Sequence, residues 1–477
     1  MPLESAAGPE GPAPGSLRRD CLSFMEVVAQ SVANIAPSAT PALIIPAVFA
    51  SSGNGLWIAY AFATIALLFV TYHINQFARR SASPGALYTF VAQGMGSSWG
   101  VISGWSLVIA YLITGGATLC GAANYVGVLL SAIGGVNATL VLSIFVVVAV
   151  AVGAWYLAYR DIELSTKFML SLEGVSVGIV MLLAIAFYVK TGHVVDARQF
   201  STAGLTPTGL TQGLVLAFFS FVGFESATAL GHEAKDPLRS IPRSVLVTVV
   251  AVGAFFTFMS YTLVNAFAAS SVSLGQSNKP MTELAIVAGL PVLGTVFAAG
   301  ATVGFFACAL ACINAGARVI YMMSKHGLVH DAAAGTHDVH ATPHVAVTLA
   351  ALVVLLAPLG LLLGKTALLD AFGYLGFVAT FGFLFAYILV SIAAPLYLRR
   401  RGELRPASVV MSVLSVAMLA VATVGSIVLS PTTPYNFLPY VFLALLAAGV
   451  GRFIYLRVAK PGVIAAIDRD LLGEAMP

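Results

Sequence analysis

Long apolar segments fill almost the whole chain and restrict the environment in which it can fold. Of its 477 residues, 59% are hydrophobic and 9% are charged, whereas a soluble domain carries roughly 25% charged residues. Each apolar segment is about 20 residues or longer, the length that crosses roughly 30 Å of hydrocarbon as a helix. We therefore predict an all-α integral membrane protein.

The apolar segments predict twelve transmembrane helices. Their expected limits are 22–50, 55–77, 98–130, 138–158, 165–189, 208–231, 242–268, 291–322, 343–363, 367–397, 407–429 and 435–456. Residues 1–21, rich in Pro, Gly and Ala, predict a disordered tail without the apolar core of a signal peptide. Residues 459–477 form a second tail, and residues 191–207 an extracellular connection.

Basic residues in the connections predict the orientation of the chain. With a cytoplasmic N-terminus, 19 of the 23 Lys and Arg residues fall on the cytoplasmic side. Lys and Arg concentrate in cytoplasmic loops, so we expect both termini in the cytoplasm. We expect a multi-pass protein of a bacterial cell membrane, surrounded by lipid. The net charge of +4 reflects the same excess of Lys and Arg in the cytoplasmic connections, so it indicates no nucleic-acid partner.

Two of the expected helices contain residues that interrupt a helix. The first contains Pro37 and Pro41, which lack an amide hydrogen and clash with the preceding turn. The sixth contains Gly223 within an apolar run. Breaks five helices apart are typical of an inverted repeat of five plus five helices. We predict repeats at 22–190 and 208–398, with helices 11 and 12 added at 399–458.

Glu225 lies in the interrupted part of the sixth expected helix. An acid at this depth in a membrane is expensive, and such residues mark substrate and ion pathways. A broken helix also frees backbone groups to face a cavity. The pattern therefore predicts a transport site around Glu225, although a carboxyl that only caps the unwound backbone fits it too.

Three stretches resemble the amino acid–polyamine–organocation (APC) transporter superfamily, over roughly residues 22–400. They are FFSFVGFE at 218–225 with EAKDPLRSIPR at 233–243, PGALYTF at 84–90, and ARVIYMMSKHG at 317–327. Ala86 and Phe90 depart from the second motif, and His232 stands where the family often has an acid. The resemblance implies a LeuT-like fold and secondary transport of an amino acid or related small amine.

The resemblance also implies where a substrate lies. A carboxylate would meet the first break, and an ammonium the carbonyl groups of the second. The implied substrate-binding residues are Asn34, Ile35, Ala36, Pro37, Ser38, Ala39, Thr40, Phe219, Ser220, Val222, Gly223 and Phe224. Tyr111 and Phe372 are further candidates from the third and tenth helices, where aromatic residues also serve as packing.

Two acids are candidates for proton coupling. Burial disfavours the charged form of a carboxyl, so we expect Glu225 to take up and release a proton during transport. Glu173, in the fifth helix, stands where some members of the resembling family have a Lys. It would hold a proton or attract a cationic substrate, unless it is a solvated residue near the helix end.

The eighth expected helix argues against sodium coupling. Residues 304–317 contain no Ser, Thr, Asp or Glu, and hard cations need oxygen ligands. We expect proton-coupled import, with substrate exchange as the alternative and a non-transporting membrane sensor as a third hypothesis. No nucleophile–base pair, metal cluster or phosphate loop indicates an enzyme. We expect no cofactor and no obligatory protein partner.

The cysteines and histidines are weak candidates for metal ligands. Cys308 and Cys312 lie four residues apart and cannot complete a zinc site by themselves. Five histidines follow the eighth helix, at positions 326, 330, 337, 340 and 344. They are candidates for metal binding and for pH sensing. Their spacing fits no standard zinc pattern, however, and favours a polar cytoplasmic loop.

Overall fold

The computed structural model describes residues 17–135, 139–200, 206–268, 270, 272–428, 433–460, 462 and 467. Within these ranges the regular structure is helical, and the β-bridge between Leu22 and Ala234 is isolated. The predicted tails therefore lie mostly outside the described residues. The all-α prediction is confirmed for the part of the chain that is described.

The long α-helices follow the expected segments within a few residues. They are α3 (Leu56–Ala78), α5 (Ser97–Gly134), α6 (Leu140–Arg160), α7 (Ile162–Thr191), α9 (Pro237–Phe267), α11 (Pro291–Lys325), α12 (His344–Leu363), α13 (Leu368–Arg400), α14 (Pro406–Val428) and α15 (Leu438–Ala459). Two short helices were not predicted, α4 (Leu87–Met95) and α10 (Pro280–Val287). At nine and eight residues they are too short to give a membrane-spanning apolar segment.

Both expected interruptions occur. The first segment divides into α1 (Phe24–Ile35) and α2 (Ile45–Ser52), and the other contains α8 (Pro207–Phe219). These pieces have 12, 8 and 13 residues, which at about 1.5 Å per residue is less than a bilayer needs. Ten helical segments of the described chain are long and apolar enough to cross a membrane, the first being Phe24–Ala78 with its break.

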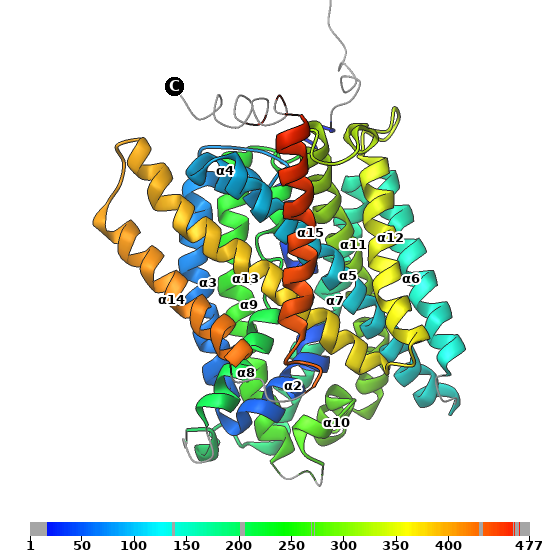
Figure 1. Ribbon diagram of the computed structural model, residues 1–477. Coiled ribbons are helices and arrows are strands. Elements are labelled where there is room, and N and C mark those ends of the chain that lie inside the picture. The colour runs from blue at the N-terminus through cyan, green and yellow to red at the C-terminus, as the bar shows by residue number, and fades with distance from the viewer. Residues whose placement is uncertain are drawn as a thin grey trace, which may run out of the picture.

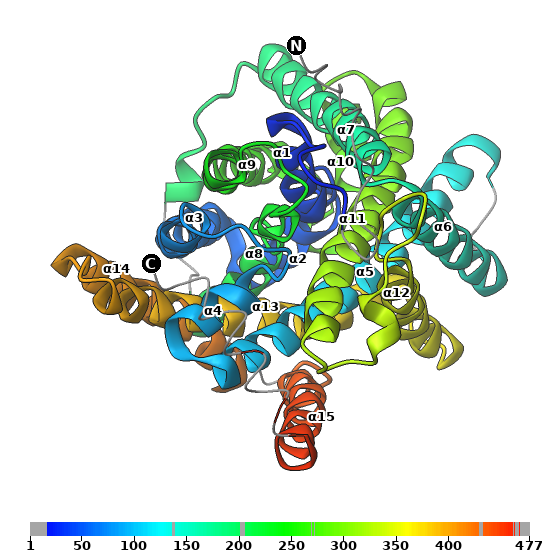
Figure 2. The ribbon, with the colours of Figure 1, turned by 90° about the horizontal axis from the view of Figure 1, so that it is seen from above.

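The interrupted helices lie inside the bundle. Seen from above, α1 is enclosed by α7, α9 and α11, and it contacts all three (Figure 2). The helices α14 and α15 lie at the periphery, where side chains such as Val413 and Val458 are exposed. Figure 1 shows α2, α8 and α10 at one end of the bundle and α4 at the other. The apolar perimeter suits a lipid surrounding.

Small residues allow the central helices to approach one another. The strongest packing is between α5 and α11 and between α5 and α13. A Cβ atom added at Gly121 of α5 would lie 2.5 Å from the ring of Phe305 on α11, and one at Gly316 would lie 2.8 Å from Leu112. Helix interfaces in membranes are rich in such small residues because dispersion contacts need close backbones.

This packing predicts that Gly121→Leu destabilises the protein by about 1–3 kcal/mol, because the new side chain displaces Phe305. Gly178→Leu is the matched control, since nothing lies within 4 Å of a Cβ at that position. Thermal unfolding in detergent measures both variants. Equal melting temperatures for the two would contradict the assigned α5–α11 interface.

Candidate functional site: two helix breaks around buried carboxyl groups

The first break follows from the proline that ends α1. Ala36 has a left-handed conformation with φ 50°, which is uncommon for a residue other than glycine. Pro37 disfavours a helical conformation at Ala36 and has no amide hydrogen with which to continue the helix. The chain resumes as a π-helical turn, η1 (Thr40–Ile44), which leads into α2. The predicted break therefore lies at residues 36–39.

The second break requires a glycine. After α8 the chain passes through turns into the 3-10 helix η4 (Ser226–Leu230). Gly223 has φ +89°, and a Cβ there would fall 1.5 Å from Nδ2 of Asn34. Only glycine combines this backbone conformation with so close an approach. The two breaks are therefore in direct contact through Asn34 and Gly223.

Hydrogen bonds tie the end of α1 to the second break. The hydroxyl of Ser226 donates to the carbonyl of Gln30 at 3.2 Å, and the amide of Ala227 donates to the hydroxyl of Ser31 at 3.1 Å. The Gln30 side chain in turn donates to the carbonyl of Ala311 on α11 at 2.9 Å. These contacts fix the position of the first break relative to the second break and to α11.

Glu225 is fully buried and is held by two tyrosines. The Tyr111 hydroxyl of α5 donates to Oε1 at 2.7 Å, and the Tyr387 hydroxyl of α13 donates to Oε2. The Tyr387 oxygen also accepts from the amide of Gly223 at 3.4 Å. Among the described residues no basic side chain pairs with Glu225. The carboxyl therefore joins the second break to α5 and α13 without a compensating positive charge.

Glu173 contacts the first break from α7. Its Oε1 accepts from the amide of Ser38 at 2.8 Å, and 1% of the residue is exposed. On the α11 side, a Cβ at Gly304 would lie 2.5 Å from Oγ of Ser38 and 2.9 Å from Oε2 of Glu173. The interpretation of Glu173 as a solvated residue is therefore wrong, because α7 and α11 enclose it against the break.

Several polar atoms around the first break have no partner among the described residues. They are both amide atoms of Asn34, Oγ of Ser38, Oγ1 of Thr40 and Oε2 of Glu173. Buried polar groups are almost always hydrogen-bonded in native proteins, and an unpaired one costs about 1–3 kcal/mol. Such a concentration at one point marks a place where a polar ligand can bind.

On the α11 side of the first break, the side chain that contacts the break is a thiol rather than a hydroxyl. The Cys308 thiol donates to the carbonyl of Asn34 at 3.1 Å and so satisfies a group freed by the break. Cys308 and Cys312 are both buried and free. The described residues contain no group of three His, Cys, Asp or Glu side chains arranged for a metal ion.

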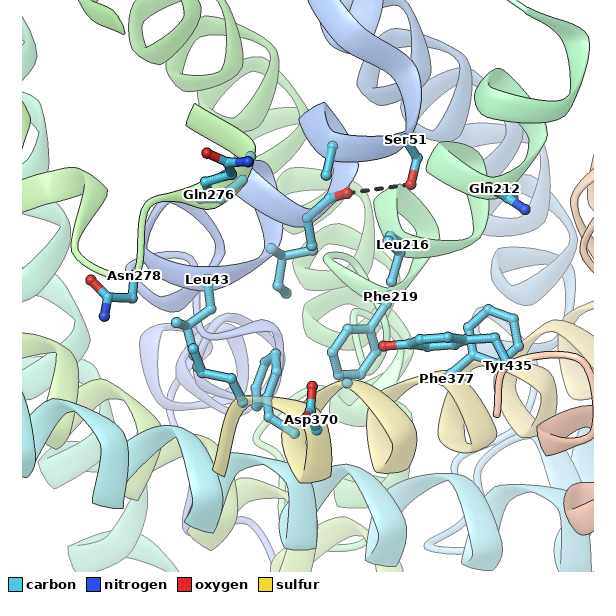
Figure 3. Close-up of a pocket in the computed structure, with 18 of the residues that line it drawn as sticks. Leu43, Ser51, Gln212, Leu216, Phe219, Gln276, Asn278, Asp370, Phe377 and Tyr435 are labelled. Atoms are coloured by element: carbon cyan, nitrogen blue, oxygen red, sulfur yellow. Dashed lines mark hydrogen bonds between the residues drawn. The ribbon is translucent and has the colours of Figure 1, made fainter. Parts of the chain in front are cut away.

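A cavity of about 460 Å³ lies beside the two breaks, toward α2 and α8. It is bounded by α2, α8, the start of α13 and the segment 275–278, with Leu43, Phe219, Asp370 and Tyr435 around it (Figure 3). The rings of Phe219 and Phe372 pack edge to face, with centroids 5.7 Å apart. Among the described lining residues Asp370 is the charged one.

The implied substrate-binding residues divide into three groups. Phe219 and Phe372 line the cavity. Tyr111 belongs to the site through Glu225, as a hydrogen-bond donor. The others are buried around the breaks and away from the cavity lining: Asn34, Ile35, Ala36, Pro37, Ser38, Ala39, Thr40, Ser220, Val222, Gly223 and Phe224.

The end of the bundle that bears α4 is closed by a buried ion pair. Arg318 of α11 donates through Nε and an Nη to both carboxylate oxygens of Glu233, each at 2.6 Å, and both side chains are 1% exposed. The carbonyl of Glu233 accepts from the amides of Cys21 and Leu22. The segment before α1 is thereby fixed to the segment that follows η4 and to α11.

The histidines after α11 do not form one cluster. His326 lies 2.5 Å from the hydroxyl of Tyr88. The rings of His337 and His340 stack with centroids 4.6 Å apart, beside Tyr159 of α6. These contacts make the connection a packed cap on α6, which agrees with the loop interpretation.

The sequence analysis predicted neither Tyr387 as a partner of Glu225 nor the pairing of Arg318 with Glu233. Tyr387 is one of many aromatic residues on α13, and nothing in its spacing distinguishes it. Arg318 and Glu233 were noticed only as parts of motifs, although a buried arginine in an apolar helix needs an acidic partner.

Comparison with known proteins shows the family. The family model described as amino acid permease matches residues 26–460. This chain belongs to the amino acid permease family. The predicted APC-superfamily membership is thus confirmed, and the protein is a transporter of this family, not an enzyme.

Individual relatives are distant. A branched-chain amino acid permease of Bacillus subtilis is 24% identical over 74% of this chain and 76% of its own length. A low-affinity putrescine importer of Escherichia coli K12 is 26% identical over 72% of this chain and 74% of its own length. The human cationic amino acid transporter 4 is 25% identical over 79% of this chain and 59% of its own length.

The closed end predicts that Glu233→Gln destabilises the protein by about 3–5 kcal/mol, because it leaves the Arg318 charge buried without its partner. Glu403→Gln is the control, since the Glu403–Arg80 pair is exposed and should matter little. Thermal unfolding in detergent compares the two. A Glu233→Gln variant as stable as the control would show that the ion pair does not hold this end closed.

Proposed function

We propose that the protein is a secondary active transporter that imports an amino acid or a related small amine across the cell membrane by alternating access. The observation that carries this proposal is the contact of two broken helices beside a buried carboxyl that has no basic partner in the described part of the chain. Free backbone groups and an unpaired acid in a membrane interior are costly. A polar substrate that binds at the breaks would form hydrogen bonds with the free backbone groups and with the carboxyl, which gives these groups a function.

The proposal includes a membrane arrangement. If α1 with α2 forms one crossing and α3 the next, the ten apolar segments give eleven crossings, and α8 with η4 adds the twelfth. Crossings 1–5 and 6–10 then form two inverted repeats, each with its first helix broken, followed by α14 and α15. Both termini lie in the cytoplasm, and the cavity at α2 and α8 opens to the outside.

Alternating access then has a physical basis at each end. Phe219 and Phe372 pack edge to face and line the outer cavity, and we assign this pair as the gate between the cavity and the breaks. The ion pair Glu233–Arg318 closes the cytoplasmic end. Aromatic rings can rotate aside at low cost, whereas opening the buried ion pair has to be driven by substrate and coupling energy. On this proposal, the described state is outward-facing and closed to the cytoplasm.

Glu225 is the proposed carrier of the coupling proton. Burial disfavours its charged form, whereas the hydrogen bonds from two tyrosine hydroxyls favour that form. Tyr387 also contacts the amide of Gly223. A change in the proton on Glu225 therefore acts directly on the second break. Sodium is not required, because the α11 residue that faces the first break offers a thiol rather than a hydroxyl.

Two alternatives remain distinct from this proposal. In an exchanger, the empty site cannot return to face the outside until it has bound a substrate molecule from the inside. Uptake then depends on substrate that is already inside. In a sensor, the ligand binds without crossing the membrane. Counterflow into proteoliposomes separates transport from sensing, and a proton gradient without internal substrate separates symport from exchange.

Glu225→Gln tests the proton role. Glutamine keeps the size of the side chain and one acceptor for the tyrosines but cannot ionise. We expect the variant to lose pH-driven net uptake while it keeps substrate exchange. Glu163→Gln, which changes a partly exposed acid in the first turn of α7, should behave as wild type. Net uptake with the wild-type dependence on pH in Glu225→Gln would rule out Glu225 as the proton carrier.

The ion dependence gives an independent test. Uptake at a fixed membrane potential should rise as the outside is made more acidic than the inside, and replacing sodium by potassium should leave it unchanged. Initial rates of radiolabelled substrate uptake measure both effects. A several-fold stimulation by sodium at constant pH would contradict proton coupling through Glu225.

A further inference from the structure

We infer that an anionic phospholipid binds in a pocket between α4, the start of α5 and the end of α13, at the end of the bundle that bears α4. The pocket has a volume of about 490 Å³ and is lined by Gly94, Met95, Trp99, Leu396, Arg399 and Arg400. It lies apart from the helix breaks, and the inference does not depend on substrate transport.

The backbones of α4, α5 and α13 build this pocket. Gly96, with φ +97°, separates α4 from α5, and Met95 and Trp99 on either side of it line the pocket. The α4 backbone meets α13 at Gly94, where a Cβ atom would lie 2.5 Å from the carbonyl oxygen of Ala393. The shape of the pocket therefore depends on how closely two helices approach, and not on one side chain alone.

The α13 wall changes from apolar to basic along one face of the helix. Ile392, Leu396 and Arg399 are spaced by four and three residues, so they follow one stripe, and all three are exposed. Trp99, across the pocket, is 43% exposed. Exposed Trp residues concentrate where the hydrocarbon of a membrane meets the headgroups. The pocket thus combines the surfaces that an acyl chain and a phosphate need.

The two arginines of the pocket have no acidic partner in the described part of the chain. The nearby acid Glu403 is already shared by Arg80 and Arg401. Arg400 donates to a backbone carbonyl of α4 at 3.3 Å. The Arg399 side chain forms no hydrogen bond or ion pair with the described residues. A phosphate supplies the oxygens that guanidinium groups bind best.

Both halves of the pocket determine the class of ligand. Basic pockets between helices on the cytoplasmic side bind anionic headgroups, and the proposed membrane arrangement places the α4 end in the cytoplasm. A soluble phosphate would leave the surface of Trp99 and Leu396 in water, whereas an acyl chain covers it. The cation of a zwitterionic headgroup finds no acid among the described lining residues.

A lipid can also reach this pocket from the side. Figure 2 shows α4 near the outer edge of the bundle, between α14 and α15. These two helices expose apolar side chains such as Val413 and Val458, which suits a lipid surrounding on both sides of α4. The ligand is therefore a molecule of the membrane itself.

The test adds single lipids to the purified full-length protein in detergent and measures stabilisation against heat. Dioleoylphosphatidylglycerol is compared with dioleoylphosphatidylcholine, which has the same acyl chains and phosphate but carries a compensating cation. Each arginine near an anionic headgroup contributes about 5-fold in affinity. We expect the anionic lipid to bind about 10-fold tighter or more, and native mass spectrometry to show one such lipid retained.

Arg399→Gln is the most direct variant, because the side chain that it removes has no partner within the described residues. We expect it to bind phosphatidylglycerol about 5-fold more weakly, with unchanged phosphatidylcholine binding and an unchanged melting temperature without lipid. Arg457→Gln removes an exposed arginine from the last turn of α15 and is the control that keeps wild-type binding. Leu396→Ser should weaken both lipids and keep their ratio.

Three outcomes would overturn the inference. The first is equal stabilisation of the wild type by the two lipids. The second is an unchanged lipid preference in Arg399→Gln, which, with a lower melting temperature, would show that Arg399 only stabilises the end of α13. The third is stabilisation by glycerol phosphate as strong as by phosphatidylglycerol, which would indicate a site for soluble anions.

Discussion

The contact between Asn34 and Gly223 is the constraint on which the rest of the structure depends. It brings two interrupted helices together inside an apolar bundle, where every freed backbone group needs a partner. The surrounding helices supply those partners with side chains. Glu173 of α7 accepts from Ser38, Cys308 of α11 donates to Asn34, and Tyr387 of α13 contacts Gly223. The breaks are therefore linked to the helices that would have to move around them.

The same arrangement explains why the region is acidic. A carboxylate is a good acceptor for free amides and for tyrosine hydroxyls, and both Glu173 and Glu225 are used in this way. Neither acid is neutralised by a basic side chain of the described residues, so protons or a bound ammonium have to balance them. Structural support of the breaks and attraction of a positive species thus come from the same two side chains.

Much of this could be predicted from the sequence because the signals are local. Pro37 and Gly223 alter the backbone at their own positions, and an acid within an apolar run is visible without a structure. The lengths of the long helices follow from the apolar segments in the same way. The short helices α4 and α10 were missed because nine and eight residues are too few for such a segment.

Pairings over long distances could not be predicted. Tyr111 and Tyr387 lie 114 and 162 residues from Glu225, and no local pattern indicates that α5 and α13 meet there. The sequence analysis proposes Tyr111 as a candidate substrate contact and contains no signal for its bond to Glu225. Likewise, the family resemblance singled out Glu173 as standing where some members have a Lys, while its bond to the Ser38 amide depends on how closely Gly304 lets α11 approach.

The central claim is that a proton on Glu225 moves with the substrate, and a zero-flux measurement tests it most directly. Proteoliposomes are clamped at zero membrane potential with a tenfold proton gradient, and the gradient of the tightest-binding compound that stops net flux is determined. One proton per substrate predicts balance at a tenfold opposing substrate gradient, and Glu225→Gln should balance at equal concentrations. Balance of the wild type at equal concentrations, whatever the proton gradient, would contradict the account.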